Sequence, residues 1–176
     1  INGIEEADFI LLVGTNPRLE ATILNARIRK AYIRNKLKIY SIGDPGDLTY
    51  QYQNIGSKTS VVREIASGTH EISEKIKKSK KPMVIIGESA LHGESGQYVF
   101  ETIKNFLSTN KFIRKDWNAL NILTQQASRV GAIDLGFYSI NKKENFSFFN
   151  KLENNDFKFV YLLGADNITF NKKDKF

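Results

Sequence analysis

The sequence of 176 residues contains no cysteine, and several other reactive or rigid residues are scarce, with two histidines, one tryptophan and three prolines. The lack of cysteine excludes disulfides, a thiolate nucleophile and any cysteine-ligated iron–sulfur or zinc site within these residues. No apolar run approaches the roughly 18 to 20 residues that a membrane-spanning helix needs. The composition, with 41% hydrophobic and 26% charged residues, is that of a folded globular domain.

The usual catalytic and phosphate-binding motifs are also missing. Neither His70 nor His92 has a partner at metal-ligand spacing, so we expect no metal site and assign no catalytic residue. Ser89 near His92 is not a nucleophile elbow, because the G-x-S-x-G turn is absent. We expect His70 to occupy a surface or capping position and Ser95 to cap the helix that follows it. No glycine-rich dinucleotide or P-loop fingerprint occurs.

Charge of one sign is in excess, with a formal net charge of +7 and a pI of about 9.5. A basic module that binds nucleic acid is therefore one hypothesis. The chain is also rich in Ile, Lys and Asn, residues whose codons are AT-rich, and genomic bias explains the excess of lysine without nucleic acid. We favour the compositional explanation. The lysine run 75–81 is then the solvated end of a helix, where cations complement the helix dipole.

What the sequence does contain is a repeated pattern of apolar runs that end in glycine. Such runs, rich in Val and Ile, are typical of strands buried on both faces of a parallel sheet. Segments with helical signals separate them, and this alternation predicts right-handed crossovers. We therefore predict an α/β fold, with an open, doubly wound, mainly parallel sheet of about four strands and helices on both faces. The predicted strands cover residues 8–14, 38–43, 82–87 and 159–164, and the predicted helices follow Asn16 or span 61–66, 71–78, 97–107 and 118–130.

The pattern predicts one domain over residues 1–168, followed by a basic tail at 169–176. Residues 141–157 are polar and rich in Asn, and we interpret them as a loop excursion. Its three phenylalanines, Phe146, Phe148 and Phe149, are candidate interface residues because clustered aromatic side chains often anchor protein contacts. The chain starts without Met and stops soon after its fourth predicted strand, which suggests a piece of a longer polypeptide.

The turns after the strands are where an open α/β sheet binds ligands. Two of these turns resemble each other, and they comprise Gly14, Thr15, Asn16 and Pro17 after the first strand and Gly164, Ala165, Asp166 and Asn167 after the fourth. One interpretation is a pair of nucleotide half-sites, and the first turn precedes a helix start, where anions bind. The other, which we favour from the residues, is that tight turns simply require small and polar residues.

Several ungapped blocks resemble the large iron–sulfur subunit of respiratory NADH:quinone oxidoreductase, complex I. They include Gly43-Asp-Pro-Gly-Asp-Leu-Thr-Tyr50 and Trp117-Asn-Ala-Leu-Asn-Ile-Leu123. The others lie at residues 3–21, 25–30, 65–70, 80–87, 89–91, 134–136 and 162–166. The resemblance extends from about residue 3 to residue 166 and is weak over 141–157.

The resemblance implies that this region is related to molybdopterin oxidoreductases, in which a Gly-x-Asn-Pro turn like Gly14 to Pro17 lies beside the pterin nucleotide. In the respiratory subunit the region is generally a scaffold without the metal cofactor. The iron–sulfur clusters belong to a cysteine-rich N-terminal segment of that subunit. We therefore expect no cofactor in this chain, and expect both four-residue turns to be vestigial.

The resemblance further implies a structural, non-catalytic module of the peripheral arm, which supports NADH-to-quinone electron transfer carried out elsewhere. Its partners would be other complex I subunits and the cysteine-rich segment. Its place would be the matrix side of the mitochondrial inner membrane, or the cytoplasmic side of a bacterial inner membrane. A molybdopterin- or nucleotide-binding oxidoreductase domain is the alternative, and a nucleic-acid-binding module is the second.

Overall fold

The computed structural model describes residues 3–126, 128–137, 151–152, 154 and 156–161. It divides into two compact units, residues 1–127 and 128–176, which are taken separately below. The predicted span of one domain over residues 1–168 stays a prediction.

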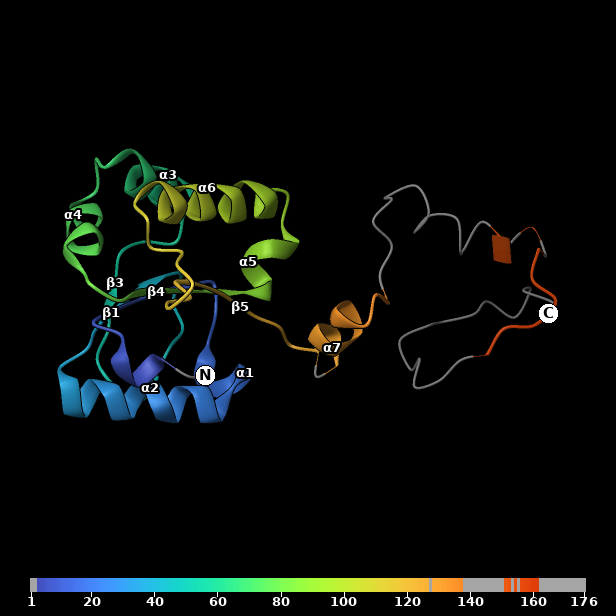
Figure 1. The fold of residues 1–176 in the computed structure, drawn as a ribbon, viewed down its shortest axis with the longest axis horizontal. Helices are drawn as coiled ribbons and strands as arrows, with labels where there is room; N and C mark the ends of the chain where they lie inside the picture. The colour runs from blue at the N-terminus through green and yellow to red at the C-terminus, as the bar shows by residue number, and fades with distance from the viewer. Residues whose placement is uncertain (1–2, 127, 138–150, 153, 155, 162–176) are drawn as a thin grey trace. The chain divides into compact units, whose positions relative to one another are not determined.

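The first unit is built on a five-stranded parallel sheet in the order β3-β2-β1-β4-β5 (Figure 1). The strands are β1 (Phe9–Val13), β2 (Lys38–Ile42), β3 (Gln53–Asn54), β4 (Pro82–Gly87) and β5 (Leu120–Leu123). All five residues of β1 and all six of β4 are buried, as expected for central strands of a parallel sheet. The paired residues Val13, Ile42 and Ile86 bring the carboxyl ends of three strands to one edge of the sheet.

Helices cover both faces of this sheet (Figure 1). One face carries the 3₁₀ turn η1 (Ile4–Glu6) and the helices α1 (Pro17–Glu20) and α2 (Thr22–Asn35). The other carries α3 (Thr59–Ser67), α4 (Glu71–Lys78) and α6 (Gly96–Thr109), while α5 (Glu88–His92) follows β4 directly. The predicted α/β fold with an open, doubly wound sheet is confirmed. The left-handed Gly68, with φ of 82°, ends α3 at the predicted place.

The two edge strands of the sheet, β5 and β3, were not predicted. Residues 118–130 were predicted to be a helix, but β5 lies there and pairs in parallel with β4. The backbone amide of Val84 donates to the carbonyl of Ala119 at 2.7 Å, so pairing with a buried strand overrides the local preference. The short strand β3 was not predicted either, and the observed sheet has five strands instead of about four.

The second unit contains α7 (Arg129–Asp134). Phe159 to Tyr161, the described part of the predicted fourth strand, do not form a strand, and Phe159 is 80% exposed. The rest of that predicted strand, the tail at 169–176 and most of the excursion at 141–157 lie outside the described residues. In the part of the chain that the structure describes, no helix is long and apolar enough to cross a bilayer.

Candidate functional site

The turn after β1 brings the first predicted site residues to the carboxyl-end edge of the sheet. Gly14 has φ of 54°, a left-handed conformation that glycine adopts without strain. Asn16 then caps α1, because its Oδ1 accepts a hydrogen bond from the backbone amide of Leu19 at 3.1 Å. Pro17 occupies the first helical position, where its missing N–H costs nothing. The predicted helix start is confirmed.

Glu20 folds back onto this turn and accepts one backbone and one side-chain hydrogen bond from it. The backbone amide of Asn16 donates to Glu20 Oε1 at 2.8 Å, and the Thr15 hydroxyl donates to Glu20 Oε2 at 3.0 Å. A carboxylate of the chain itself therefore takes the hydrogen bonds that a bound anion would take at this turn. The sequence interpretation missed Glu20, which lies four residues after the Asn cap and so one residue beyond the N3 position where a capping box places Glu or Gln.

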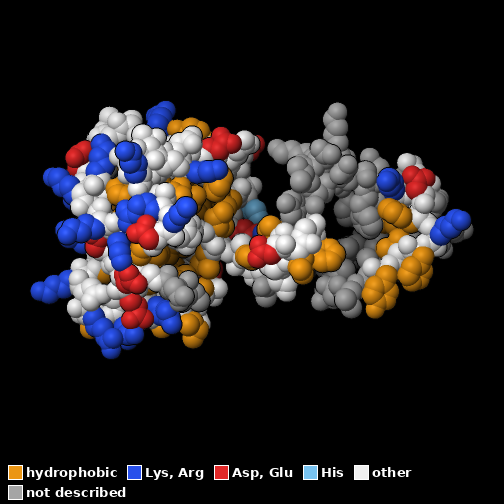
Figure 2. All heavy atoms as spheres, in the orientation of Figure 1, with side chains coloured by type: hydrophobic (Ala, Val, Ile, Leu, Met, Phe, Trp, Pro, Cys, Tyr) orange, Lys and Arg blue, Asp and Glu red, His pale blue; other side chains and the backbone are white. Residues whose placement is uncertain are grey.

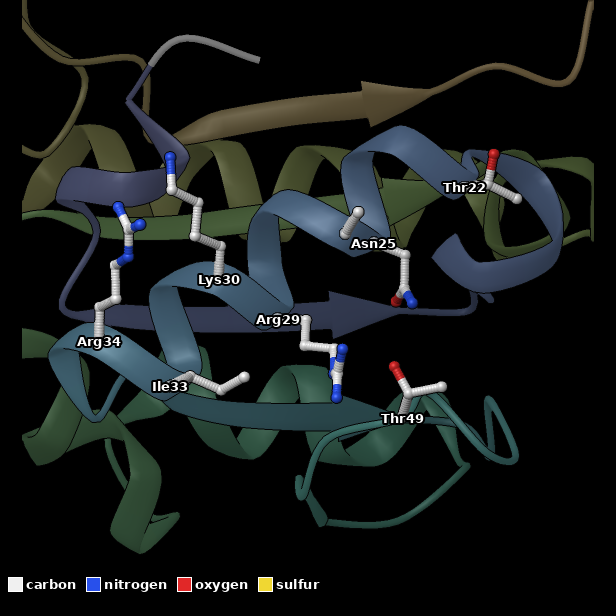
Figure 3. A pocket seen from close by; sticks show the side chains of 8 residues that line it. Thr22, Asn25, Arg29, Lys30, Ile33, Arg34 and Thr49 are labelled. Atoms are coloured by element: carbon white, nitrogen blue, oxygen red, sulfur yellow. The ribbon is translucent and has the colours of Figure 1, made fainter.

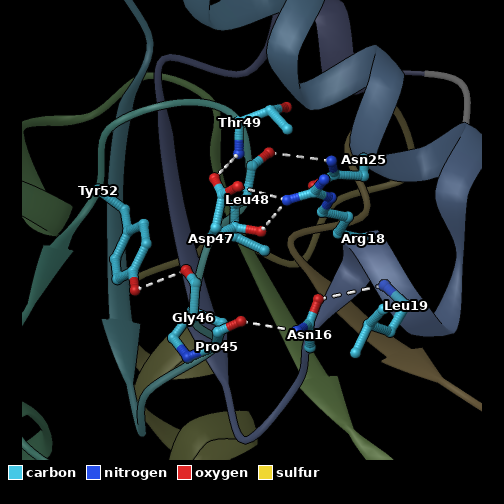
Figure 4. Close-up of polar contacts among 10 residues, drawn as sticks. All are labelled: Asn16, Arg18, Leu19, Asn25, Pro45, Gly46, Asp47, Leu48, Thr49 and Tyr52. Carbon is cyan, nitrogen blue, oxygen red and sulfur yellow. Dashed lines mark hydrogen bonds and ion pairs between the residues drawn. The ribbon is translucent and has the colours of Figure 1, made fainter.

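The loop after β2 lies against the turn after β1 and the start of α1 (Figure 4). Asn16 Nδ2 donates to the carbonyl of Pro45 at 2.6 Å, and Arg18 forms an ion pair with Asp47 at 2.5 Å. A hydrogen bond from the backbone amide of Thr49 and the contact with Arg18 hold the pKa of Asp47 below its usual value. The loop is thus fixed against the start of α1 by contacts within the chain.

The helix α5 packs closely on the same turn. A Cβ added to Gly87 would lie 2.2 Å from the carbonyl oxygen of Gly14 and 2.7 Å from Cβ of Thr15. The Ser89 hydroxyl donates to that same Gly14 carbonyl. Buried Glu88 accepts the backbone amide of Gln125 at 2.8 Å, which fixes the segment after β5. Through these contacts, the start of α5 packs directly against the turn after β1 and the segment after β5.

A small crevice remains between these walls. Its volume is about 230 Å³, and it is lined by Gly14, Thr15, Asn16, Glu20, Gly43, Asp44, Pro45 and Ser89. Pockets for drug-sized ligands typically have roughly 300 to 1,000 Å³. Both ionisable side chains in the lining are acidic, which is unfavourable for a phosphate group.

Comparison with known proteins gives one family and several long relatives. A family model described as molybdopterin oxidoreductase matches residues 1–176. The chain belongs to the molybdopterin oxidoreductase family. It is 42% identical, over 98% of its length and 25% of the relative's, to the NADH-ubiquinone oxidoreductase 75 kDa subunit of Reclinomonas americana. It is 39% identical to the mitochondrial 78 kDa subunit of Candida albicans, over 96% of this chain and 22% of that one.

A third relative is the mitochondrial NADH dehydrogenase [ubiquinone] iron-sulfur protein 1 of Solanum tuberosum, 36% identical over 98% of this chain and 22% of the relative. The chain thus spans about a quarter of the length of the curated relatives that it matches. The recognition of the family from the sequence blocks is confirmed.

In a molybdopterin oxidoreductase domain, the turn at Gly14 would need space and hydrogen-bond donors to hold a pterin nucleotide. The residues present fit that group poorly. Glu20 accepts the Thr15 hydroxyl and the Asn16 backbone amide, Asp44 adds a second carboxylate, and the crevice is small.

The remaining predicted positions have mixed outcomes. His70 caps α4, because its Nδ1 accepts a hydrogen bond from the backbone amide of Ile72 at 3.2 Å, and the prediction for His70 is confirmed. His92 lies 3.3 Å from Glu88. Ser95 occupies the N-cap position of α6, as predicted. Its side chain makes no capping hydrogen bond, however, and its hydroxyl lies 3.3 Å from that of Thr59.

Other predicted residues cannot be placed. Gly164, Ala165, Asp166, Asn167, Phe146, Phe148 and Phe149 lie outside the described residues, and their proposed roles stay predictions. Among the described residues, no group of three or more His, Asp or Glu side chains could hold a metal ion.

Proposed function

We propose that this chain is a structural, non-catalytic module of the peripheral arm of respiratory complex I. Electron transfer from NADH to quinone would be carried out by other segments and subunits. The observation that carries the proposal is the identity of 36 to 42% to subunits of NADH-ubiquinone oxidoreductase over nearly the whole chain. The chain itself would contribute a folded domain and a surface on which other subunits dock.

The non-catalytic part of the proposal is supported by the chemistry of the residues. Without cysteine, this chain has no thiolate ligand to offer an iron–sulfur cluster. Glu20 takes the hydrogen bonds of the turn where a nucleotide phosphate would lie. The clusters would reside in a cysteine-rich segment outside this chain, and the strand-end turns would be vestiges of a cofactor site.

The proposal places the chain on the matrix side of the mitochondrial inner membrane, in contact with other complex I subunits. Two of the three relatives described above have the word mitochondrial in their names. The cytoplasmic side of a bacterial inner membrane is the alternative location. The peripheral arm suits a chain whose described part contains no membrane-spanning helix.

The test is a non-denaturing gel of native membranes, stained for NADH dehydrogenase activity and analysed by mass spectrometry. We expect peptides of this chain in the active band, together with peptides of a cysteine-rich segment. A chain that migrates alone as a small species, or an active complex that lacks it, contradicts the proposal.

A molybdopterin- or nucleotide-binding oxidoreductase domain is the second candidate function, favoured by the family match and by the crevice at the strand ends. Metal analysis and the fluorescence of extracted pterin, measured on the purified assembly, distinguish the two. Pterin in stoichiometric amounts would favour this candidate, and its absence would favour the structural role.

A further inference from the structure

The helix α2 is apolar on two faces, and only one of them is covered within the first unit. On the inner face, Ile28 is fully buried and Ala31 is 1% exposed. On the outer face, Ile23 is 68% exposed and Ile33 is 63% exposed, and Leu19 of α1 is 80% exposed. Isolated apolar residues on a surface are ordinary, but both isoleucines lie on the side of α2 that faces away from Ile28 and Ala31, and nothing in the described part of the first unit covers them.

A groove runs along this outer face, between α2 and the loop after β2, and we call it the α2 groove (Figure 3). Its volume is about 420 Å³, and its described lining includes three cations, Arg29, Lys30 and Arg34, and no acidic residue. In Figure 3, Arg29 extends from the helix toward Thr49 of the loop. The groove therefore combines the apolar side chain of Ile33 with the positive charges of Arg29, Lys30 and Arg34.

The cations of this surface differ in how far they are already neutralised. Lys30 pairs with Glu5 at 2.6 Å, and Arg18 pairs with Asp47. Within the described part of the chain, the Arg29 side chain forms no ion pair or hydrogen bond. It lines the groove, so its planar set of donors is available there to a carboxylate.

The opposite wall of the groove is held in an unusual conformation. Thr49 has φ of 69°, although it is branched at Cβ and this backbone conformation is disfavoured for such residues. It is kept there by its amide, which donates to Asp47 Oδ1 at 2.8 Å, and by Asn25, whose Nδ2 donates to the neighbouring Leu48 carbonyl at 3.0 Å. The structure thus maintains a hydroxyl at the edge of the groove, exposed and opposite Arg29.

We propose that the α2 groove docks an acidic, amphipathic polypeptide segment that lies outside this chain. A carboxylate of that segment pairs with Arg29, and its apolar side chains cover Ile23 and Ile33. This inference rests on the proposed role as a module of a larger assembly. The relatives are about four times as long as this chain, so in them most of the polypeptide lies outside the matched region and could supply such a segment.

A polypeptide fits this surface better than a nucleic acid does. Phosphate-binding surfaces depend on several cations that are free to contact the backbone. Of the three cations that line the α2 groove, Lys30 is already paired with Glu5, and the exposed Ile33 lies among them. Acidic and basic side chains are also interspersed on the face of the first unit that Figure 2 shows. Apolar residues with an unpaired arginine are typical of the centre of a protein–protein interface.

The first experiment is photo-crosslinking within the native assembly. The photoreactive residue p-benzoyl-phenylalanine replaces Ile33, and in a matched control it replaces Tyr98 of α6, which is 44% exposed. After irradiation, the crosslinked peptides are identified by mass spectrometry. We expect position 33 to capture one defined peptide that contains Asp or Glu, and position 98 not to capture that peptide.

The second experiment tests the arginine with matched variants. Arg29→Glu should lower the fraction of this chain that co-migrates with the active band by about tenfold. Arg63→Glu should leave that fraction unchanged, because Arg63 is an exposed arginine in the middle of α3, away from the groove. Reversing the charge of the crosslinked acidic residue should restore co-migration of Arg29→Glu.

The outcomes separate the inference from the proposed function. If the unaltered chain does not co-migrate with the active band, the proposed function fails. If it co-migrates but position 33 captures no polypeptide, captures only nucleic acid, or captures a peptide without an acidic residue, the docking inference alone is overturned. Equal effects of Arg29→Glu and Arg63→Glu overturn it as well.

Discussion

The two ends of β1 each meet a carboxylate that accepts backbone hydrogen bonds. At the amino-terminal end, Asp8 accepts the amides of Lys80 at 2.8 Å and Lys81 at 3.0 Å. At the carboxyl-terminal end, Glu20 accepts the amide of Asn16 at 2.8 Å and the hydroxyl of Thr15 at 3.0 Å. Only the second end is a position where an α/β sheet binds ligands. In this chain, carboxylates of the protein itself accept hydrogen bonds at both ends.

The two carboxylates differ in how far they reach along the chain. The donors to Asp8 lie 72 and 73 residues away, so this contact joins β1 to the start of β4. The donors to Glu20 lie only 4 and 5 residues away, so that contact shapes a local turn. The comparison indicates that Asp8 stabilises the tertiary fold, whereas Glu20 occupies the anion position of a turn that other contacts already hold.

The largest effect is expected at the carboxyl-terminal end of β1, where Gly87 packs against the turn that begins at Gly14. In Gly87→Ala the new methyl group would lie 2.2 Å from the Gly14 carbonyl oxygen, so the turn must move. We expect a loss of about 3 kcal/mol in the free energy of unfolding, the upper range for overpacking. Urea denaturation followed by circular dichroism measures it. Gly93→Ala is the control, because no heavy atom lies within 4 Å of its added Cβ. Equal losses in the two variants would contradict the packing argument.

The long-range contact at the amino-terminal end comes next in size. Asp8→Ala leaves two backbone amides and the Ser79 hydroxyl without their acceptor, and we expect a loss of about 1 to 2 kcal/mol. Asp116→Ala is the control, since Asp116 makes only an exposed ion pair with Arg114 and should change stability by less than about 0.5 kcal/mol. Denaturation of both variants at neutral pH is the measurement, and a smaller loss for Asp8→Ala than for Asp116→Ala would refute it.

The same contact predicts a pH dependence. Partial burial acts to raise the pKa of Asp8, but the hydrogen bonds from Ser79, Lys80 and Lys81 outweigh it and hold the pKa below the ordinary value of 3.8. The ionised form therefore stabilises the fold above about pH 4, and this contribution is lost as the pH falls through the lowered pKa. Between pH 5 and 3, the unaltered chain should lose more stability than Asp8→Asn, as measured by denaturation at each pH. Parallel curves would contradict this.

The two predicted caps provide the third test. Asn16→Ala removes the capping acceptor of α1 and the hydrogen bond to Pro45, and should cost about 1 kcal/mol. Ser95→Ala should cost much less, because the Ser95 side chain makes no capping bond to α6. Denaturation of both variants compares them directly. A loss for Ser95→Ala as large as for Asn16→Ala would show that the Ser95 side chain caps α6 in solution.

The central part of the sheet could be predicted from the sequence because its strands are buried on both faces. The runs at 8–14, 38–43 and 82–87 are mostly apolar, and each is a strand near its predicted bounds. The edge could not be predicted in the same way. Leu120 and Leu123 are only half-buried, so their spacing is compatible with either a helix or an edge strand. Tertiary pairing with β4 decides between them.

The same limit applies to the candidate site. The Asn16–Pro17 start was predictable because capping is a local interaction between neighbouring residues. The sequence also contains both apolar stripes of α2, but it does not show which stripe faces the sheet. Ile28 proved to be buried and Ile23 exposed. That choice depends on residues far away in the chain, and the uncovered stripe became apparent only from the fold.

The smallest effect is expected at Glu20, and it tests the comparison itself. In Glu20→Gln one side-chain oxygen remains to accept a hydrogen bond from the turn, and in Glu20→Ala water can reach both donors, because Glu20 is only partly buried. We expect losses below about 0.5 kcal/mol for Glu20→Gln and of about 0.5 to 1 kcal/mol for Glu20→Ala. Both should fall below the loss in Asp8→Ala under the same denaturation conditions. A loss for Glu20→Ala equal to that for Asp8→Ala would mean that the turn after β1 depends on its carboxylate, and the two ends of β1 would then be equivalent structural ties.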